Sequence, residues 1–349
     1  MTSNDLIKGK ATSFDIAYRA GVSQSTVSRA LRDSELVNLE TRKKIKAIAK
    51  ELNYKVDKNA SNLRTKQSTT LALLLFEDPT NDDSQINPFF LSMLGSITRA
   101  CASQGYDLLV SFQQLSNDWQ ADYEDCHKAD GIILLGYGDF EAYQNKLVQL
   151  ESQGTHFVLW GAGKSESHGV VIGCDNIKGG FDLTSHLIKL GRRKIAFLGG
   201  VSSGSPEFLD RYLGSRQAIE KSGLEFNSEL QFDAITNEQS GYQAASRLIE
   251  SGLEFDAVFC ASDLIAVGAI KALREHQYLV PKDIAVVGYD DIPLAEYVRP
   301  SLTTAHQDTK AAGEVLVRNL IKLINNEPAQ GEVIPATLKI RESCGCGLG

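Results

Sequence analysis

The hydrophobic and polar positions divide the chain into three segments. Over residues 12–56 the apolar residues recur at helical spacing, which predicts short amphipathic helices and no strands. Residues 57–68, DKNASNLRTKQS, are polar and predict a linker. From Thr69 onward short apolar runs alternate with amphipathic stretches, which predicts strands alternating with helices. The predicted domains are a head, a linker and a body: residues 1–57, 58–68 and 69–349.

The body is predicted to be an α/β domain with parallel sheets, because strands that alternate with helices are joined by right-handed crossovers. Its apolar runs are short and rich in Val, Ile, Leu and Phe, as in strands buried on both faces. The predicted strands are 71–76, 107–112, 131–136, 156–161, 170–174, 195–200, 257–261 and 285–288. One compact domain usually carries fewer strands than this. We therefore divide the body into two lobes. The first has the bounds of about 69–161 and 303–338, and the second has the bounds of about 162–302 with the C-terminal tail.

The head has the end signals of three helices. Thr12 and Asp15 can form a capping box that opens the first helix, and Gly21 supplies a tight turn after it. Ser23 can cap the second helix and Asn38 the third. A helix, a glycine-containing turn and a second short helix form the helix-turn-helix unit, so the head is predicted to be an all-α domain of this kind.

The second predicted helix carries side chains that can read DNA. Gln24 and Ser25 lie in its first turn, and Gln24 can pair with adenine as Arg29 can with guanine, each through two hydrogen bonds in the major groove. Short hydroxyl side chains suited to phosphate oxygens lie beside them: Ser23, Thr26 and Ser28. A basic helical module can also be no more than a solvated surface, but the turn, the caps and the polar second helix together favour DNA binding.

The charge distribution supports the same division. The whole chain of 349 residues has a formal net charge of −8, which by itself argues against a nucleic-acid partner. Residues 1–70, however, hold 14 Lys and Arg against 7 Asp and Glu, a balance of +7, and leave −15 for the remainder. A basic head on an acidic body indicates an anionic partner for the head alone.

Membrane, disulfide-rich and metal-binding classes are not indicated. The N-terminal MTSNDLIKGK has no apolar core, and the longest apolar runs are far shorter than the ~20 residues that span a bilayer, so we expect a cytoplasmic protein without membrane contact. The six cysteines are expected to be free thiols, and Cys344-Gly-Cys346 lacks the second pair that a zinc site needs. The six histidines are scattered, so neither a metal nor a cofactor is predicted.

Two segments resemble enzyme motifs without meeting their requirements. Residues 200–204, GVSSG, match G-x-S-x-G after a strand, but a nucleophile elbow needs a helix directly after the serine, and a loop is predicted here. Residues 161–165, GAGKS, lack the first glycine of a phosphate-binding loop. No catalytic residue is therefore predicted.

Two segments of the head carry a specific signature, DIAYRAGVSQSTVSRAL at residues 15–31 and ETRKKIKAIAKELNY at residues 40–54. They resemble the head of the LacI family of bacterial transcriptional regulators. In that family a hinge helix follows the head, and a leucine from each subunit of a dimer wedges into the minor groove of the operator. ASNLRT fits this hinge, which implies DNA contacts at Ala60 and Leu63, whereas Asp57 stands where the family usually has asparagine. Further expected DNA-binding residues are Thr12, Ser13, Asn38 and Tyr54.

Polar and aromatic residues follow several predicted strands of the body. Trp160 ends one apolar run, Asp263 follows another, Asp290 a third, and Arg211 comes after the loop that begins at Gly199. Ligands of open α/β sheets bind at the carboxyl ends of strands. Carboxylates and a guanidinium there can hydrogen-bond sugar hydroxyls, and an indole can lie against the apolar face of a sugar. A purely structural role is the alternative for the indole and for both carboxylates.

The LacI-family resemblance continues through VIGCDNIKGGFDLTSHLIKLGRRKIAFLGG, FCASDLIAVGAIKAL, PKDIAVVGYDDIPLAEYVRPSLTT and RESCGC. It implies a body similar to periplasmic sugar-binding proteins, with two Rossmann-like lobes, three crossings between them and a ligand cleft. Ser262 departs from the asparagine that usually precedes the aspartate of this motif. The implied effector-binding residues, together with the indole at a strand end, are Phe89, Trp160, Arg211, Asp263, Asp290 and Gln307.

Together these features predict a homodimeric, sequence-specific repressor of carbohydrate-utilisation genes. Two heads would read a pseudo-palindromic operator in double-stranded DNA, and a mono- or oligosaccharide bound between the lobes would release it. Three alternatives remain: a regulator whose ligand is a corepressor such as a purine or phosphosugar, a solute-binding protein, and a sugar-active enzyme. The basic head counts against the second, and the third lacks a convincing catalytic pair.

Overall fold

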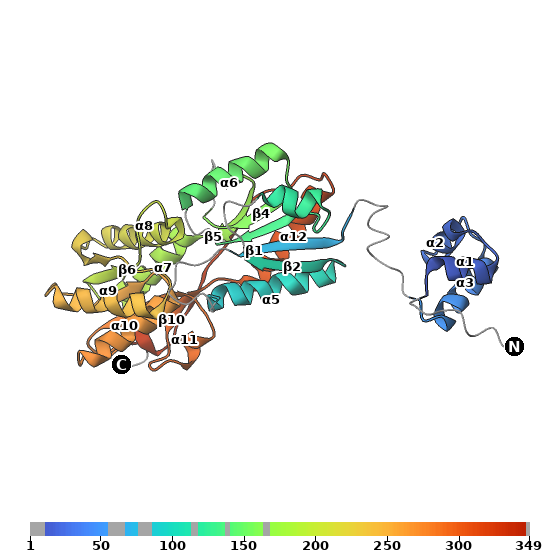
Figure 1. The fold of residues 1–349 in the computed structure, drawn as a ribbon. Helices are drawn as coiled ribbons and strands as arrows, with labels where there is room; N and C mark the ends of the chain where they lie inside the picture. Colours follow the sequence, from blue (N-terminus) through green and yellow to red (C-terminus); the bar gives the residue numbers. More distant parts are fainter. Residues whose placement is uncertain are drawn as a thin grey trace. The chain divides into compact units, whose positions relative to one another are not determined.

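The computed structural model describes residues 11–54, 67–75, 86–112, 118–136, 140–162 and 168–346 (Figure 1). The chain divides into two compact units between Ser68 and Thr69, and each unit is described by itself.

The head is a bundle of three helices: α1 (Ser13–Ala20), α2 (Gln24–Leu31) and α3 (Leu39–Glu51). The capping box of α1 is present, since the side chain of Asp15 accepts a 2.7 Å hydrogen bond from the backbone N–H of Thr12. Gly21 ends α1 in the left-handed conformation, with φ 70° and ψ 35°, which costs glycine little because it has no Cβ. One fully buried residue from each helix fills the centre of the bundle: Ile16, Val27 and Ile45.

The first lobe of the body is built on a parallel sheet of order β11-β5-β4-β3-β1-β2. Helices α5 (Pro88–Ser103) and α12 (Thr309–Ile324) pack on one face, and α6 (Phe140–Gln153) with the π-helical turn η1 (Gln120–Asp125) packs on the other (Figure 1). The strands are β1 (Thr70–Leu75), β2 (Asp107–Phe112), β3 (Ile132–Leu135), β4 (Phe157–Trp160), β5 (Val170–Cys174) and β11 (Glu332–Ile334).

The second lobe has a sheet of order β12-β10-β9-β8-β6-β7, parallel except for the pair β10 and β12. Its strands are β6 (Ile195–Leu198), β7 (Gln231–Phe232), β8 (Ala257–Cys260), β9 (Ala285–Asp290), β10 (Thr303–His306) and β12 (Thr337–Lys339). Its helices and helical turns are α7 (Asn176–Lys189), α8 (Pro206–Lys221), η2 (Ser228–Leu230), α9 (Glu238–Glu250), α10 (Asp263–Glu275), α11 (Leu294–Tyr297) and η3 (Glu342–Cys344).

Glycines let the helices of the second lobe cross in close pairs. A Cβ on Gly180 of α7 would overlap the backbone of Arg211 in α8, and a Cβ on Gly214 of α8 would overlap the backbone of Ile177. Gly241 and Gly268 allow the same close approach of α9 and α10. The first pair fixes α8 against the start of α7, which places the Arg211 side chain.

The predicted lobe boundaries are wrong at three strands, β5, β10 and β12. We expected the first lobe to end at residue 161, but β5, at residues 170–174, pairs with β4 and lies in the first sheet. We expected residues 303–338 in the first lobe, but β10 pairs with β9, and β10 and β12 belong to the second sheet. A short apolar run fits either sheet, and only tertiary pairing decides which. The predicted three crossings are confirmed, because the chain passes from one lobe to the other after β5, after β10 and between β11 and β12.

Strand β2 also differs from expectation. It was predicted to be buried on both faces, yet it is the edge strand of the first sheet and none of its residues is buried. Leu109, Val110 and Phe112 are 37%, 40% and 51% exposed. A long apolar edge is unusual for a protein surface that faces only water.

Candidate DNA-reading helix and effector site

Helix α2 presents the polar face that the sequence predicted. Ser23 caps the helix, its hydroxyl accepting a hydrogen bond from the backbone N–H of Thr26 at 3.2 Å. Val27 is buried in the head core, while Ser25 and Arg29, one turn apart, are exposed. An exposed serine and arginine on the side away from the core can reach a DNA groove without disturbing the bundle.

Two of the other predicted contacts on this helix already have protein partners. The amide nitrogen of Gln24 donates to the hydroxyl of Ser13 at 2.9 Å, which joins α2 to the first turn of α1. The hydroxyl of Ser28 accepts a 2.8 Å hydrogen bond from Arg32, one turn later. These bonds orient the side chains in the free protein.

The remaining predicted head residues lie at helix ends. Thr12 belongs to the capping box, and the exposed Asn38 caps α3 by accepting from the backbone N–H of Thr41 at 2.8 Å. Tyr54 is partly buried against the head core. Ala60 and Leu63 lie outside the described residues.

Several basic residues of α3 hold the head together. Lys44 donates to the carbonyl oxygen of Ala20 at 2.9 Å, at the end of α1. Lys46 forms a 2.6 Å ion pair with Asp33, and its hydrogen bond lowers the pKa of that carboxyl group. Arg42 donates to the carbonyl oxygen of the same aspartate. Counting these side chains as a basic surface missed that they tie α3 to the ends of the other helices.

In the body, Arg211 is the centre of a buried polar cluster. Its side chain is 4% exposed, and its Nε donates to Asn176 at 2.9 Å. The guanidinium also donates to the carbonyl oxygen of Ala261 and lies 3.6 Å from a carboxylate oxygen of Asp290. The ring of Tyr289 stacks on it, with 3.8 Å between guanidinium carbon and ring centroid. The cluster therefore joins α7, α8, β9 and the residue that follows β8.

Asp290 is the second member of the cluster, at the end of β9. Its oxygen Oδ1 accepts a 2.7 Å hydrogen bond from Gln307 and also faces Arg211. Burial raises the pKa of its carboxyl group to about 6, although both neighbours act to lower it. Its φ of 114° lies in the region that residues with a Cβ rarely adopt, so the surrounding contacts hold a strained backbone here.

Asp263 is fully buried at the start of α10, with both carboxylate oxygens bonded to protein donors. Oδ1 accepts from the hydroxyl of Thr304 at 2.6 Å, and Oδ2 accepts from the backbone N–H of Ile292 at 2.9 Å. Burial, and then the nearby Asp290 charge, raise the pKa of this carboxyl group well above its ordinary value. A Cβ at position 288 would overlap Oδ1, so Gly288 makes room for this carboxylate.

Phe89 and Trp160 form the aromatic part of the site. Phe89 lies in the first turn of α5, where Asn87 caps the helix, and Trp160 ends β4. Their ring centroids are 6.0 Å apart with the rings inclined at 46°. Both side chains belong to one apolar cluster with Leu264 and Ile292 of the second lobe, so they lie where the two lobes pack together.

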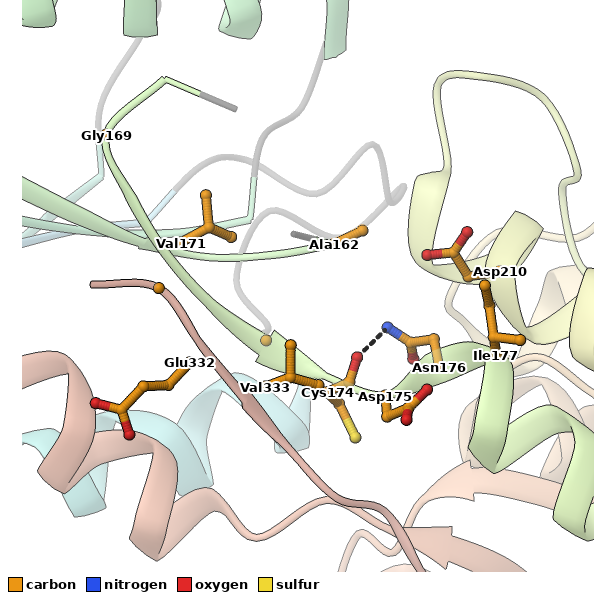
Figure 2. Close-up of a pocket in the computed structure, with 12 residues that line it drawn as sticks. Ala162, Gly169, Val171, Cys174, Asp175, Asn176, Ile177, Asp210, Glu332 and Val333 are labelled. Carbon is orange, nitrogen blue, oxygen red and sulfur yellow. Dashed lines mark hydrogen bonds between the residues drawn. The ribbon is translucent and has the colours of Figure 1, made fainter. Parts of the chain in front are cut away.

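A pocket of about 360 Å³ opens beside the first crossing between the lobes (Figure 2). Asn176 lines it and donates to the carbonyl oxygen of Cys174, as Figure 2 shows. The other lining residues include Asp175, Asp210 and Val333, and none of the six predicted effector residues is among them. Because Asn176 also holds Arg211, it links this pocket to the buried cluster.

Sequence reasoning assigned no individual role to three residues that support the cluster: Asn176, Tyr289 and Thr304. Asn176 and Tyr289 position Arg211, and Thr304 bonds Asp263. Asn176 and Tyr289 sit inside segments that carry the family resemblance, directly beside strand ends, which is the signal that could have found them.

Among the described residues, no helix has the length and apolarity to cross a bilayer, and no three His, Cys, Asp or Glu side chains form a metal-holding group.

A helix-turn-helix head with a two-lobed body defines a DNA-binding transcriptional regulator with a ligand-sensing domain. The comparisons agree: residues 14–57 match the profile of bacterial regulatory proteins of the lacI family, and residues 184–344 match a periplasmic binding protein-like domain. The chain is 33% identical to the HTH-type transcriptional regulator RegA of Clostridium saccharobutylicum, over 90% of this chain and 92% of RegA. The protein belongs to the lacI family.

Two solved structures are similar over nearly the whole chain. The complex of the transcriptional regulator CelR with cellobiose is 29% identical, covers 95% of this chain and 99% of its own, and superposes with a TM-score of 0.71. The structure of the Lac repressor dimer bound to operator covers 96% of this chain and 99% of its own chain. It superposes with a TM-score of 0.81 at 23% identity, which shows the shared fold.

Proposed function

We propose that this protein is a repressor of carbohydrate-utilisation genes that leaves its operator when a mono- or oligosaccharide binds between the lobes. The observation that carries the proposal is the buried cluster of Arg211, Asp290 and Gln307 near the surface where the lobes meet. Charged groups held rigidly in a low-dielectric site suit recognition of several hydroxyl groups, and the aromatic pair of Phe89 and Trp160 suits the apolar face of a sugar. The similarity to a CelR–cellobiose complex supports this ligand class.

On the DNA side, we assign base reading to Gln24 and Arg29 and phosphate contacts to the hydroxyls around them. The exposed position of Arg29 on α2 supports this assignment. Ala60 and Leu63 are assigned to the operator minor groove on the family resemblance. The protein would act in the cytoplasm by binding alone. In support, residues 199–205 form a loop before α8 begins at Pro206, so Ser202 does not sit on the strand-to-helix elbow of a hydrolase.

The protein is proposed to act as a homodimer, because a two-fold dimer matches the two half-sites of a pseudo-palindrome. The surface we assign to the dimer is the exposed edge strand β2 together with α5, which packs beside it. This surface carries Leu91, 47% exposed, besides the apolar residues of β2. A second copy would cover an edge that is otherwise open to unwanted pairing. The similarity to a Lac repressor dimer supports the assembly.

A titration tests the proposed ligand class. The full-length protein is bound to the DNA site that it selects from a random library, and cellobiose, ribose or a purine base is added while the bound fraction is measured. Release by a sugar, with no effect of the purine, is the expected result. Tighter DNA binding on addition of the purine would show that the ligand is a corepressor and not an inducer. A protein that selects no DNA site would overturn the proposal.

A further inference from the structure

A pair of cysteines lies on the C-terminal turn of the second lobe, apart from the buried cluster around Arg211. Cys344 ends η3 and is 1% exposed, whereas Cys346 is exposed. Gly345 between them has φ 88° and ψ 9°, a left-handed turn that glycine adopts without strain. One buried thiol and one exposed thiol thus share a single tight turn.

The buried thiol has a histidine partner. Nε2 of His186, in the last turn of α7, lies 3.3 Å from Sγ of Cys344, and the carbonyl oxygen of Arg341 lies 3.4 Å from the same sulfur. Burial alone would raise the pKa of the Cys344 thiol. Hydrogen bonds from His186 and Thr303 and from the backbone N–H of Cys346 outweigh burial, so the pKa lies below its ordinary value.

The other buried cysteines that the structure describes have the opposite environment. Burial raises the pKa of Cys101 and Cys174 to about 11 and also raises that of Cys260. The thiolate is the nucleophilic form of cysteine. Cys344 is therefore set apart from these three residues by its partners, although all four are buried.

The turn also permits a bond between the two sulfurs. Two trans peptide units separate Cα atoms by at most about 7.6 Å, and a left-handed turn at the middle residue shortens that distance. A disulfide needs Cα atoms roughly 4.4–6.8 Å apart. We propose that Cys344 and Cys346 form a dithiol that reacts reversibly with low-molecular-weight disulfides, and that His186 is the positioning residue for the Cys344 sulfur.

The reaction has two exchange steps. The thiolate of Cys346, which is accessible, attacks one sulfur of the small disulfide, whose S–S bond breaks and releases one thiolate. The thiolate of Cys344 then attacks the Cys346 sulfur, forming the Cys344–Cys346 bond and releasing the second small thiolate. The protein loses two electrons and two protons, which the small disulfide gains as it becomes two thiols. Burial shields Cys344 from the reagent but not from its neighbour on the turn.

The test treats the full-length protein with glutathione disulfide and follows the C-terminal peptide by mass spectrometry. The wild type is expected to lose two hydrogen atoms from this peptide and to keep no glutathione on it. Cys344→Ser is expected to stop at the mixed disulfide on Cys346. The matched control is Cys126, an exposed cysteine whose thiol donates to the backbone carbonyl oxygens of Asp122 and Tyr123. Its mixed disulfide should persist, and Cys126→Ser should leave ring closure unchanged.

A second variant separates positioning from structure. His186→Gln is expected to move the pH midpoint of the closure step upward and to slow closure near neutral pH by roughly an order of magnitude. Its circular dichroism should match the wild type. A wild-type protein that retains glutathione on Cys346 as stably as on Cys126 would overturn the proposed reaction between the two cysteines. An unshifted pH midpoint in His186→Gln would show that the histidine does not position the Cys344 sulfur. Neither result depends on the proposed sugar or operator.

Discussion

Gln307 donates a 2.7 Å hydrogen bond to Asp290, and this bond joins the buried cluster around Arg211 to a crossing between the lobes. Asp290 ends β9 in the second lobe. Gln307 directly precedes Asp308, the N-cap of α12, which packs on the first lobe. A ligand that competes for the Asp290 carboxylate therefore acts on a residue at the boundary of the two lobes. Only a ligand that prefers one arrangement of the lobes can shift the equilibrium between them.

Asp290→Ala is expected to abolish release of the operator by the effector while operator affinity stays within a factor of about two. The substitution removes the acceptor for Gln307 and the charge facing Arg211, both at the proposed ligand site and neither on the head. Operator binding with and without the sugar measures both quantities. Asp233→Ala, at an exposed loop of the same lobe, is the control. Loss of operator binding in Asp290→Ala would show that the carboxylate has a structural role instead.

The raised pKa of Asp290 predicts a pH-dependent stability. Because the folded-state pKa is about 6 against an ordinary 3.8, the folded protein holds this proton more tightly than the unfolded chain does. The contribution of this group to stability therefore falls as pH rises from about 4 to about 6 and stays low above that range. Asp290→Asn keeps an acceptor for Gln307 but cannot ionise. The difference in unfolding free energy, variant minus wild type, should rise across this pH window. A difference that is flat in urea titrations from pH 4 to pH 7 would contradict the assignment.

The features that the sequence predicted well are those set by neighbours along the chain. The capping box of Thr12 with Asp15 and the cap at Ser23 depend on residues within one helical turn, and both are present. The sheet to which β5 and β10 belong depends on pairing with distant strands, so the local pattern could not reveal it. The contact between Asn176 and Arg211 joins positions 35 residues apart and needs the close crossing of α7 and α8.

Gly288→Ala is expected to destabilise the body by about 1–3 kcal/mol, because the added methyl group would overlap the buried Asp263 carboxylate. Thr304 and the backbone N–H of Ile292 hold that carboxylate in place, so it has little freedom to move away. The control is Gly204→Ala in the exposed loop before α8, where the nearest atom to the new Cβ, the hydroxyl oxygen of Ser202, lies at 3.5 Å. There the unfolding free energy should change by no more than about 0.5 kcal/mol. Urea denaturation of both variants measures the contrast, and equal stabilities would refute the overlap.

Arg29→Ala is expected to cost about 1–3 kcal/mol of binding free energy on the selected operator and to relax base preference at one position of each half-site. Arg29 is exposed on α2, opposite the core residues of the head, so the fold should not change. Arg19→Ala removes an equal charge from an exposed position of α1. It is the control for a loss of DNA affinity that comes from charge alone. Binding to a library with each base varied measures the preference. If both variants lose affinity equally on all sequences, Arg29 contacts phosphate rather than a base.

Val110→Lys is expected to weaken the dimer and, through it, the operator affinity. Val110 is 40% exposed on the edge strand β2, and a charge buried at an interface without a partner is costly. Sedimentation velocity should show monomers at concentrations where the wild type is dimeric. Because a monomer engages one half-site only, operator affinity should fall steeply while binding to an isolated half-site stays unchanged. The matched control is Val148→Lys on α6, where the valine is 46% exposed on the opposite face of the first sheet. A Val110→Lys protein that remains dimeric would show that the dimer interface does not include β2.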